Sequence, residues 1–315
     1  MAILPRGLHS HTTLETTDIV KALRFYREVL GLSTGQQLEK VGLLRATNDH
    51  IAAIIQLPKP SPQPYWNYYA RPVPRADVDR LHAAVVAVAG EYEIREVTEP
   101  SIETRFGIGT YGFAIHDRDG NWWRIEDQDG PFGWVDVPEL ESASIVPPGP
   151  IHYVTLESSD IEKTAAFYRE FVGFACTIRD GAIHSPEAGG VHIITVPVQG
   201  DVTPQPVLNH HGLTLDEHDR AGVDRAQALV REQQERWGIR KIQQITDQHG
   251  SYQFYFQDAD TNWWEVETLH AGLNPWQRVN QPQGSSHLLH PDHGANTVIH
   301  PYGTGRSTLD VVNVV

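Results

Sequence analysis

Three side chains in the second half of this sequence, His152, His210 and Glu265, are of types that bind transition metals. Two neutral imidazoles and one carboxylate can occupy one face of an octahedral ion and leave three positions open. That arrangement suits Fe(II), which must hold a chelating substrate and dioxygen together. A closed structural zinc site would favour thiolates, and the chain has a single cysteine. The residues therefore indicate an open metal site.

An internal repeat supports this choice. Phe25–Glu28 recurs 142 positions later as Phe167–Glu170, and Asn121–Trp123 recurs 141 positions later as Asn262–Trp264. Two similar halves should bury similar cores, so residues that differ chemically between them are not demanded by the fold. Four such pairs are Ser10 and His152, Tyr68 and His210, Arg124 and Glu265, and Ala114 and Tyr255. The asymmetry predicts a site in the second half.

The elements that must position these residues follow a regular order. In the first unit a strand-like segment, 7–15, precedes a helix that Asp18 can cap and Gly31 can end. Three more units repeat this order, with helices expected at 76–88, 160–172 and 220–237. The pattern predicts an α+β fold of four βαβββ modules in two paired domains.

The expected domains are an N-terminal two-module domain without metal ligands, 1–146, and a C-terminal metal-binding domain, 147–270. A tail or arm, 271–315, fits no module. We expect a homo-oligomer.

Composition excludes several classes of protein. The net charge is −15 without a basic cluster, which argues against a nucleic-acid or anionic-membrane partner. No apolar run approaches the roughly 20 residues of a membrane helix. The first residues lack the apolar stretch of a signal peptide, and the single cysteine fits a reducing compartment. We therefore expect a cytoplasmic protein.

From about residue 7 to 267 the sequence resembles the type I extradiol ring-cleaving dioxygenases of the vicinal oxygen chelate (glyoxalase/bleomycin resistance/dioxygenase) superfamily. The most specific segment, His249–Glu265, is similar to a pattern of histidine, spacer, apolar–Tyr pair, acidic turn and ligand glutamate. Tyr255 stands ten residues before Glu265, as in that family. Ala259 and Thr261 replace the usual proline and glycine of the turn, and the spacer after His249 is slightly short.

The resemblance implies an Fe(II)-dependent enzyme, with Mn(II) as the alternative ion, that opens a catechol-type ring with O2. Its partners would be O2 and a small aromatic diol. The run Leu208–His210 resembles the family's second-ligand strand, which favours His210 over His211 as the ligand.

Three further residues receive roles from the resemblance. His192 would be the catalytic acid–base, with His184 as the substitute, although His50 occupies a similar place in the first half. Tyr255 and His249 would hydrogen-bond the substrate oxygens.

Three alternatives stay open. A hydroquinone-type dioxygenase of the same superfamily would take its first ligand from the first unit, where His11 precedes Phe25 at nearly the spacing that separates His152 from Phe167. A glyoxalase-type lyase or isomerase would want a first-half carboxylate, where Arg124 stands. A non-catalytic protein that binds small aromatics would not need the metal ligands.

Overall fold

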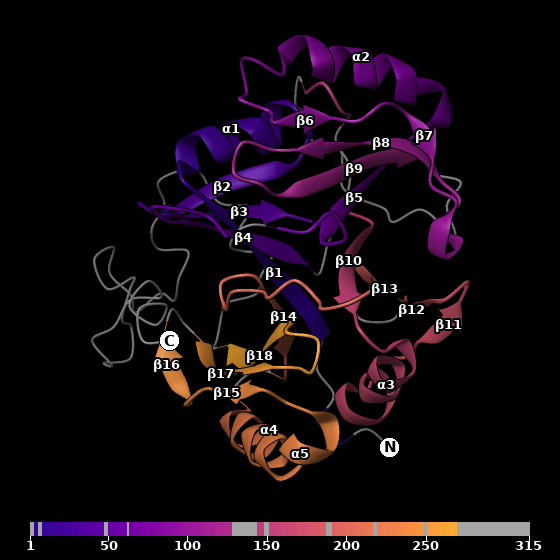
Figure 1. The fold of residues 1–315 in the computed structure, drawn as a ribbon. Coiled ribbons are helices and arrows are strands. Elements are labelled where there is room, and N and C mark those ends of the chain that lie inside the picture. The colour runs from indigo at the N-terminus through magenta and orange to yellow at the C-terminus, as the bar shows by residue number, and fades with distance from the viewer. Residues whose placement is uncertain are drawn as a thin grey trace.

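The computed structural model describes residues 3–5, 8–46, 50–61, 63–127, 144–147, 151–186, 191–216, 219–248 and 251–269. They form two mixed nine-stranded sheets covered by helices (Figure 1). In Figure 1, α1 (Ile19–Glu28) and α2 (Val78–Val88) lie at one end of the molecule, and α4 (Arg220–Glu232) and α5 (Gln234–Trp237) lie at the other. Among the described residues, no helix is both long and apolar enough to cross a membrane.

The first sheet combines strands from the two ends of the chain. Its strands are β1 (Leu8–Thr16), β2 (Ser33–Leu38), β3 (Val41–Arg45), β4 (Ile51–Gln56), β14 (His210–Thr214), β15 (Lys241–Ile242), β16 (Thr246–Gln248), β17 (Ser251–Gln257) and β18 (Trp263–Leu269). Their order is β15-β17-β18-β14-β1-β4-β3-β2, with β16 paired to β17.

The second sheet holds the middle of the chain. Its strands are β5 (Tyr68–Val73), β6 (Glu96–Val97), β7 (Ser101–Ile102), β8 (Tyr111–His116), β9 (Trp122–Asp127), β10 (Tyr153–Ser158), β11 (Thr177–Arg179), β12 (Ala182–Ser185) and β13 (His192–Pro197). Their order is β11-β12-β13-β10-β5-β9-β8-β6, with β7 paired to β8. The remaining helical segments are η1 (Arg75–Asp77), η2 (Arg105–Gly107), α3 (Ile161–Ala166) and the π-helical η3 (Phe167–Val172).

The predicted α+β fold of four modules is confirmed, but the modules pair differently from the expected domains. β1 of the first module pairs with β14 of the fourth, and β5 of the second pairs with β10 of the third. The expected division between 146 and 147 therefore does not follow the sheets, because each sheet draws strands from both halves. The expected tail, 271–315, lies outside the described residues.

The repeated sequence anchors have structural roles in both halves. Asp18 caps α1 by accepting hydrogen bonds from the backbone N–H groups of Val20 and Lys21, as the sequence predicts. Trp123 and Trp264 are fully buried, and each indole N–H donates to an aspartate, Asp117 or Asp258, in the preceding turn. These tryptophans are therefore core residues that hold each module together.

Candidate metal centre

Three side chains from two modules converge on the first sheet: His11 of β1, His210 of β14 and Glu265 of β18. Each offers one ligand atom, and the three atoms lie within 4.8 Å of one another. His11 Nε2 lies 2.9 Å and His210 Nε2 2.8 Å from the same carboxylate oxygen, Oε2 of Glu265. All three residues are buried. Two imidazole nitrogens and a carboxylate at this separation form a donor set that fits a divalent transition metal.

Strand register explains why these residues meet. His11 is the register partner of Gly212, and Gly212 is the partner of Glu265, so a glycine lies between the two ligands. A Cβ at Gly212 would lie 1.9 Å from Cε1 of His11. The imidazole therefore occupies the space that any side chain at this position would need. His210, two residues before Gly212, projects from the same face of β14 because side chains alternate along a strand.

Neighbouring groups orient both imidazoles. His210 donates from Nδ1 to the carbonyl of Val207 at 2.7 Å, which holds the ring with Nε2 facing the cluster. On His11, Nδ1 lies 3.2 Å from Ser10 Oγ and 3.4 Å from Glu267 Oε1. A proton on Nδ1 of His11 would likewise leave Nε2 as the ligand atom. Sequence reasoning missed Glu267, whose counterpart in the other half, Glu126, is also a glutamate and gives no sign of asymmetry.

The cluster has strong internal electrostatics. Burial alone would lower the pKa of His11, but the charges and hydrogen bonds of Glu267 and Glu265 outweigh it and raise that pKa to about 10. Burial alone would raise the pKa of Glu265, but hydrogen bonds from His11 and His210 hold it well below its usual range. The metal-free site therefore contains an ionised carboxylate and a protonated His11 at neutral pH, and a bound cation would take the place of that proton.

Tyr255 lies beside the cluster, as predicted. It is the register partner of Glu265, and its ring centroid is 4.9 Å from that of His210. The phenol hydrogen-bonds Glu265 and accepts from Gln253 Nε2 at 2.9 Å. Burial raises the pKa of Tyr255 well above its ordinary value, so the phenol keeps its proton. The predicted alternation along β17 is also confirmed, because Phe254 and Phe256 lie in the main core.

Beside His11, strands β3 and β4 of the first module present aliphatic side chains. Ile51 of β4 is the register partner of His11, and Leu43 of β3 is the partner of Ala53. Leu43, Ile51 and Ala53 form one cluster of their own, separate from the main core. The strand of the first module next to the ligands thus contributes aliphatic groups where a further carboxylate would complete a four-ligand site.

The structure does not bring His152 or His192 to this cluster. Both lie in the second sheet, where the His152 N–H donates to the Ala70 carbonyl at 2.8 Å and the two rings stand 5.5 Å apart. Burial, and then the neighbouring His152, lowers the pKa of His192 to about 4. The expectation that His152 joins His210 and Glu265 is therefore wrong in this geometry, and so is the expectation that His192 lies near them. The reason is that β14 hydrogen-bonds to β1 and not to β10.

Two other histidines named from the sequence do not add to the cluster. His184 of β12 bonds through Nε2 to the Phe106 carbonyl at 3.0 Å, also in the second sheet. His249 lies outside the described residues. His211 leaves the opposite face of β14 from His210, and its Nδ1 lies 3.2 Å from Nε2 of His9. Only one of the adjacent pair, His210, can therefore be a ligand, as alternation predicts.

The equivalent place in the second sheet carries a polar network of a different kind. In the repeat, the counterparts of His11, His210 and Glu265 are Tyr153, Tyr68 and Arg124. The two phenol oxygens lie 3.2 Å apart, Tyr153 donates to Glu126 at 3.1 Å, and Arg124 donates to the same carboxylate at 2.8 Å. A guanidinium thus supplies a permanent positive charge there. Each of the three cluster residues thus differs chemically from its counterpart in the repeat. The difference between His11 and Tyr153 was the signal in the sequence that would have identified His11.

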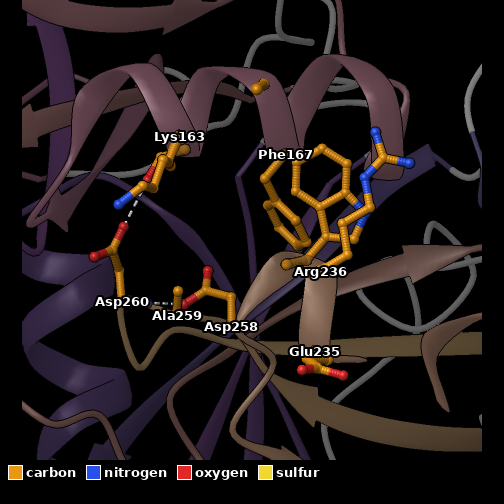
Figure 2. Close-up of a pocket in the computed structure, with 11 residues that line it drawn as sticks. Lys163, Phe167, Glu235, Arg236, Asp258, Ala259 and Asp260 are labelled. Carbon is orange, nitrogen blue, oxygen red and sulfur yellow. Dashed lines mark hydrogen bonds between the residues drawn. The ribbon is translucent and has the colours of Figure 1, made fainter. Parts of the chain in front are cut away.

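A separate hollow lies between α3, α5 and the turn that joins β17 to β18. Figure 2 shows it between Lys163, Phe167 and Arg236 and the turn that contains Asp258 and Asp260, and its volume is about 460 Å³. Asp258 accepts from the Asp260 N–H at 2.9 Å, and Asp260 accepts from the Thr164 hydroxyl at 2.6 Å. These carboxylates stabilise the turn and its contact with α3, so we assign no chemistry to this hollow.

Comparisons with known proteins agree with this architecture. Residues 9–125 match the model of the Glyoxalase/Bleomycin resistance protein/Dioxygenase superfamily. A Bacillus subtilis protein provisionally named a dioxygenase is 16% identical, with a TM-score of 0.58 over 94% of this chain and 90% of that one. Glyoxalase I from Zea mays is 13% identical, with a TM-score of 0.56 over 83% and 92%. At these identities the likeness establishes the fold alone. A comparison with curated proteins finds no match.

Proposed function

We propose that this chain is a metal-dependent ring-cleaving dioxygenase of the hydroquinone type, within the glyoxalase/bleomycin resistance/dioxygenase superfamily whose model matches residues 9–125. Its substrates would be O2 and a small aromatic diol. One observation carries the proposal: the buried cluster takes His11 from the first module and His210 and Glu265 from the fourth. The catechol-type alternative depended on His152 as the first ligand and His192 as the acid–base, and both lie in the other sheet.

The donor set supports an open coordination site. His11, His210 and Glu265 would hold one face of an Fe(II) ion, with Mn(II) as the alternative, and the rest would be left for substrate and dioxygen. When bound, the ion would supply the Lewis acidity that lowers the pKa of a substrate hydroxyl and the redox chemistry that dioxygen requires.

The residues around the cluster have separate tasks. Tyr255 keeps its proton at neutral pH, so it can donate a hydrogen bond to a substrate oxygen held next to Glu265. Gln253 fixes the phenol oxygen by donating to it at 2.9 Å. Leu43 and Ile51 offer aliphatic surface to an aromatic ring and exclude water from that side of the site.

A glyoxalase-type lyase or isomerase is the second candidate, since the fold is shared with glyoxalase I. Ala53 argues against it, because this residue holds the place in β4 that Glu265 holds in β18, two residues beyond the register partner of the histidine, where the first module would have to supply a fourth ligand. A non-catalytic binding protein would keep the aliphatic wall, but nothing in its function would require two imidazoles on one buried carboxylate oxygen.

Metal reconstitution followed by a substrate panel tests the proposal. The protein is loaded anaerobically with Fe(II), and oxygen consumption and new absorbance are followed with substituted hydroquinones and catechols. We expect turnover with hydroquinones. Turnover of catechols alone, or isomerisation of a hemithioacetal without oxygen uptake, would refute it. His11→Ala should lose the metal, whereas the matched variant His152→Ala should retain it, and the reverse result would restore the catechol-type assignment.

A further inference from the structure

A cavity of about 350 Å³ lies at the end of the first sheet, close to the metal cluster. Its described lining comprises Pro204, Gln205, Pro206, Val207, Arg240, Lys241, Gln257, Thr261 and Trp263. Within that lining Arg240 and Lys241 are cationic and no side chain is acidic, although the whole chain has a net charge of −15. The cavity is therefore a local positive site in an acidic protein.

One layer of side chains separates this cavity from the metal ligands. Trp263 is the register partner of His210, and the carbonyl of Val207 accepts the Nδ1 hydrogen bond of that histidine. Val207, Trp263 and Tyr255 form a single apolar cluster. A molecule in the cavity would thus rest against the far side of the residues that orient the metal site.

Four residues that are neighbours across adjacent strands of the first sheet have equivalents at the same positions of the second sheet, and the residue types differ at three of the four positions. They are Lys241, Gln257, Trp263 and His210 in the first sheet, and Glu96, His116, Trp122 and Tyr68 in the second. The local backbone is also the same, because Arg240 donates from Nε to the Ala259 carbonyl at 2.9 Å and Arg95 donates to the Arg118 carbonyl at 3.0 Å. The fold therefore does not dictate the residues that differ.

In the second sheet the equivalent space is filled. His116 stacks on Trp122 with centroids 4.1 Å apart and planes 2° apart, and Tyr65 packs against Trp122 at 5.1 Å. In the first sheet the matching residues are smaller, Gln257 for His116 and Val207 for Tyr65. The cavity in the metal-binding sheet thus arises from two reductions in side-chain size.

The charge at the rim is reversed as well. Lys241 replaces Glu96, and its Nζ stands 5.9 Å from the centroid of the Trp263 ring. We propose that this cavity binds the carboxylate of a small planar organic acid, with Lys241 and Arg240 on the cationic side and Trp263 as the apolar floor. An acidic group gains attraction from the two cations, and a planar body gains contact with the indole.

The link between this site and the metal centre rests on the proposed function. Cleavage of a hydroquinone breaks the bond between a hydroxylated carbon and its neighbour, and both atoms of O2 enter the product. One oxygen ends in a carboxylic acid and the other in an aldehyde or ketone, so the reaction always creates a carboxylate. The cavity would then hold either that ring-opened acid or a separate substrate molecule that carries a carboxyl substituent.

Binding to the metal-free protein tests the site without any catalysis. Benzoate, cis,cis-muconate and the neutral benzyl alcohol are titrated at low ionic strength by calorimetry and by tryptophan fluorescence. We expect both acids to bind at least about tenfold more tightly than benzyl alcohol, since only they interact with the two cations. Tighter binding of benzoate would point to a substrate carboxyl group, and tighter binding of muconate to the ring-opened product.

Variants locate the binding. Lys241→Glu should weaken benzoate binding by about tenfold, because it restores the charge of the other sheet. The double variant Val207→Tyr with Gln257→His should abolish binding by filling the cavity with the residues that the other sheet carries. Circular dichroism and thermal unfolding show whether each variant is folded.

Two matched variants distinguish the charge that Arg240 contributes to the cavity from its hydrogen bond to the turn. Arg240→Gln and Arg95→Gln each remove a donor to a turn carbonyl, but only Arg240→Gln should weaken carboxylate binding. Acids that bind no better than benzyl alcohol, or a folded cavity-filled variant that binds like the unmodified protein, would overturn the proposal. The metal plays no part in these measurements, so a failed ring-cleavage assay would leave their result intact.

Discussion

Replacing Gly212 with alanine should remove the metal while leaving the fold in place. The new Cβ would lie 1.9, 2.2 and 2.4 Å from three atoms of the His11 ring. Restoring ordinary contact, which begins at 3.4 Å, requires the ring to move by about 1.5 Å. Ligand atoms must keep their positions to within about 0.2 Å to bind a metal well. We therefore expect the affinity for Fe(II) or Mn(II) to fall by more than about 100-fold.

The cost to stability should be smaller than the loss of metal. Overpacking a well-filled interior costs about 1–3 kcal/mol, so Gly212→Ala should stay folded with a lowered melting temperature. Gly35→Ala is the matched control, because it lies in the same sheet and its Cβ would meet nothing within 4 Å. Metal content by mass spectrometry and anaerobic titration give the readout. A folded Gly212→Ala protein with undiminished metal affinity would refute the placement of His11 over this glycine.

Further substitutions and pH test the same cluster. Glu265→Ala should purify folded but with little metal, since the two imidazoles supply no negative charge; full metal and activity would remove Glu265 from the ligand set. Glu267→Gln should lower metal affinity by about 10–100-fold in equilibrium titrations, because it weakens the contact that orients His11. Tyr255→Phe should retain the metal but slow turnover by roughly 10²–10⁴, and an unchanged rate would exclude a hydrogen-bonding role for the phenol. The pKa of His11 is raised to about 10 in the metal-free protein, so metal must displace a proton. Affinity should then rise by about tenfold per pH unit between pH 6 and 8, and calorimetry in buffers of different ionisation enthalpy should detect the released proton.

Local sequence determined the modules and much of each strand's orientation. Asp18 predicts the start of α1 because a capping carboxylate acts within one turn. Alternation along β17 sends Phe254 and Phe256 to the core and Tyr255 to the site, because successive side chains of a strand leave opposite faces. The repeat also pointed to His210 and Glu265, two of the proposed ligands, because their counterparts, Tyr68 and Arg124, are of different chemical types and lie in a network with Tyr153 and Glu126.

The first ligand needed the tertiary structure. His11 and His152 stand at nearly the same distance before the matching helix residues Phe25 and Phe167, so local spacing cannot separate them. The choice depends on which opening strand hydrogen-bonds to β14. That pairing joins Gly212 of β14, in the fourth module, to His11 in the first.

The physical reason is that a strand's own sequence determines which side chains lie on each of its faces. It does not determine which other strand it hydrogen-bonds with. Both β1 and β10 are buried strands of similar composition, and either could satisfy the backbone hydrogen bonds of β14. The folded chain joins the first module to the fourth and the second to the third. Sequence therefore determined the modules and two of the three proposed ligands, while long-range strand pairing decided that His11 is the third.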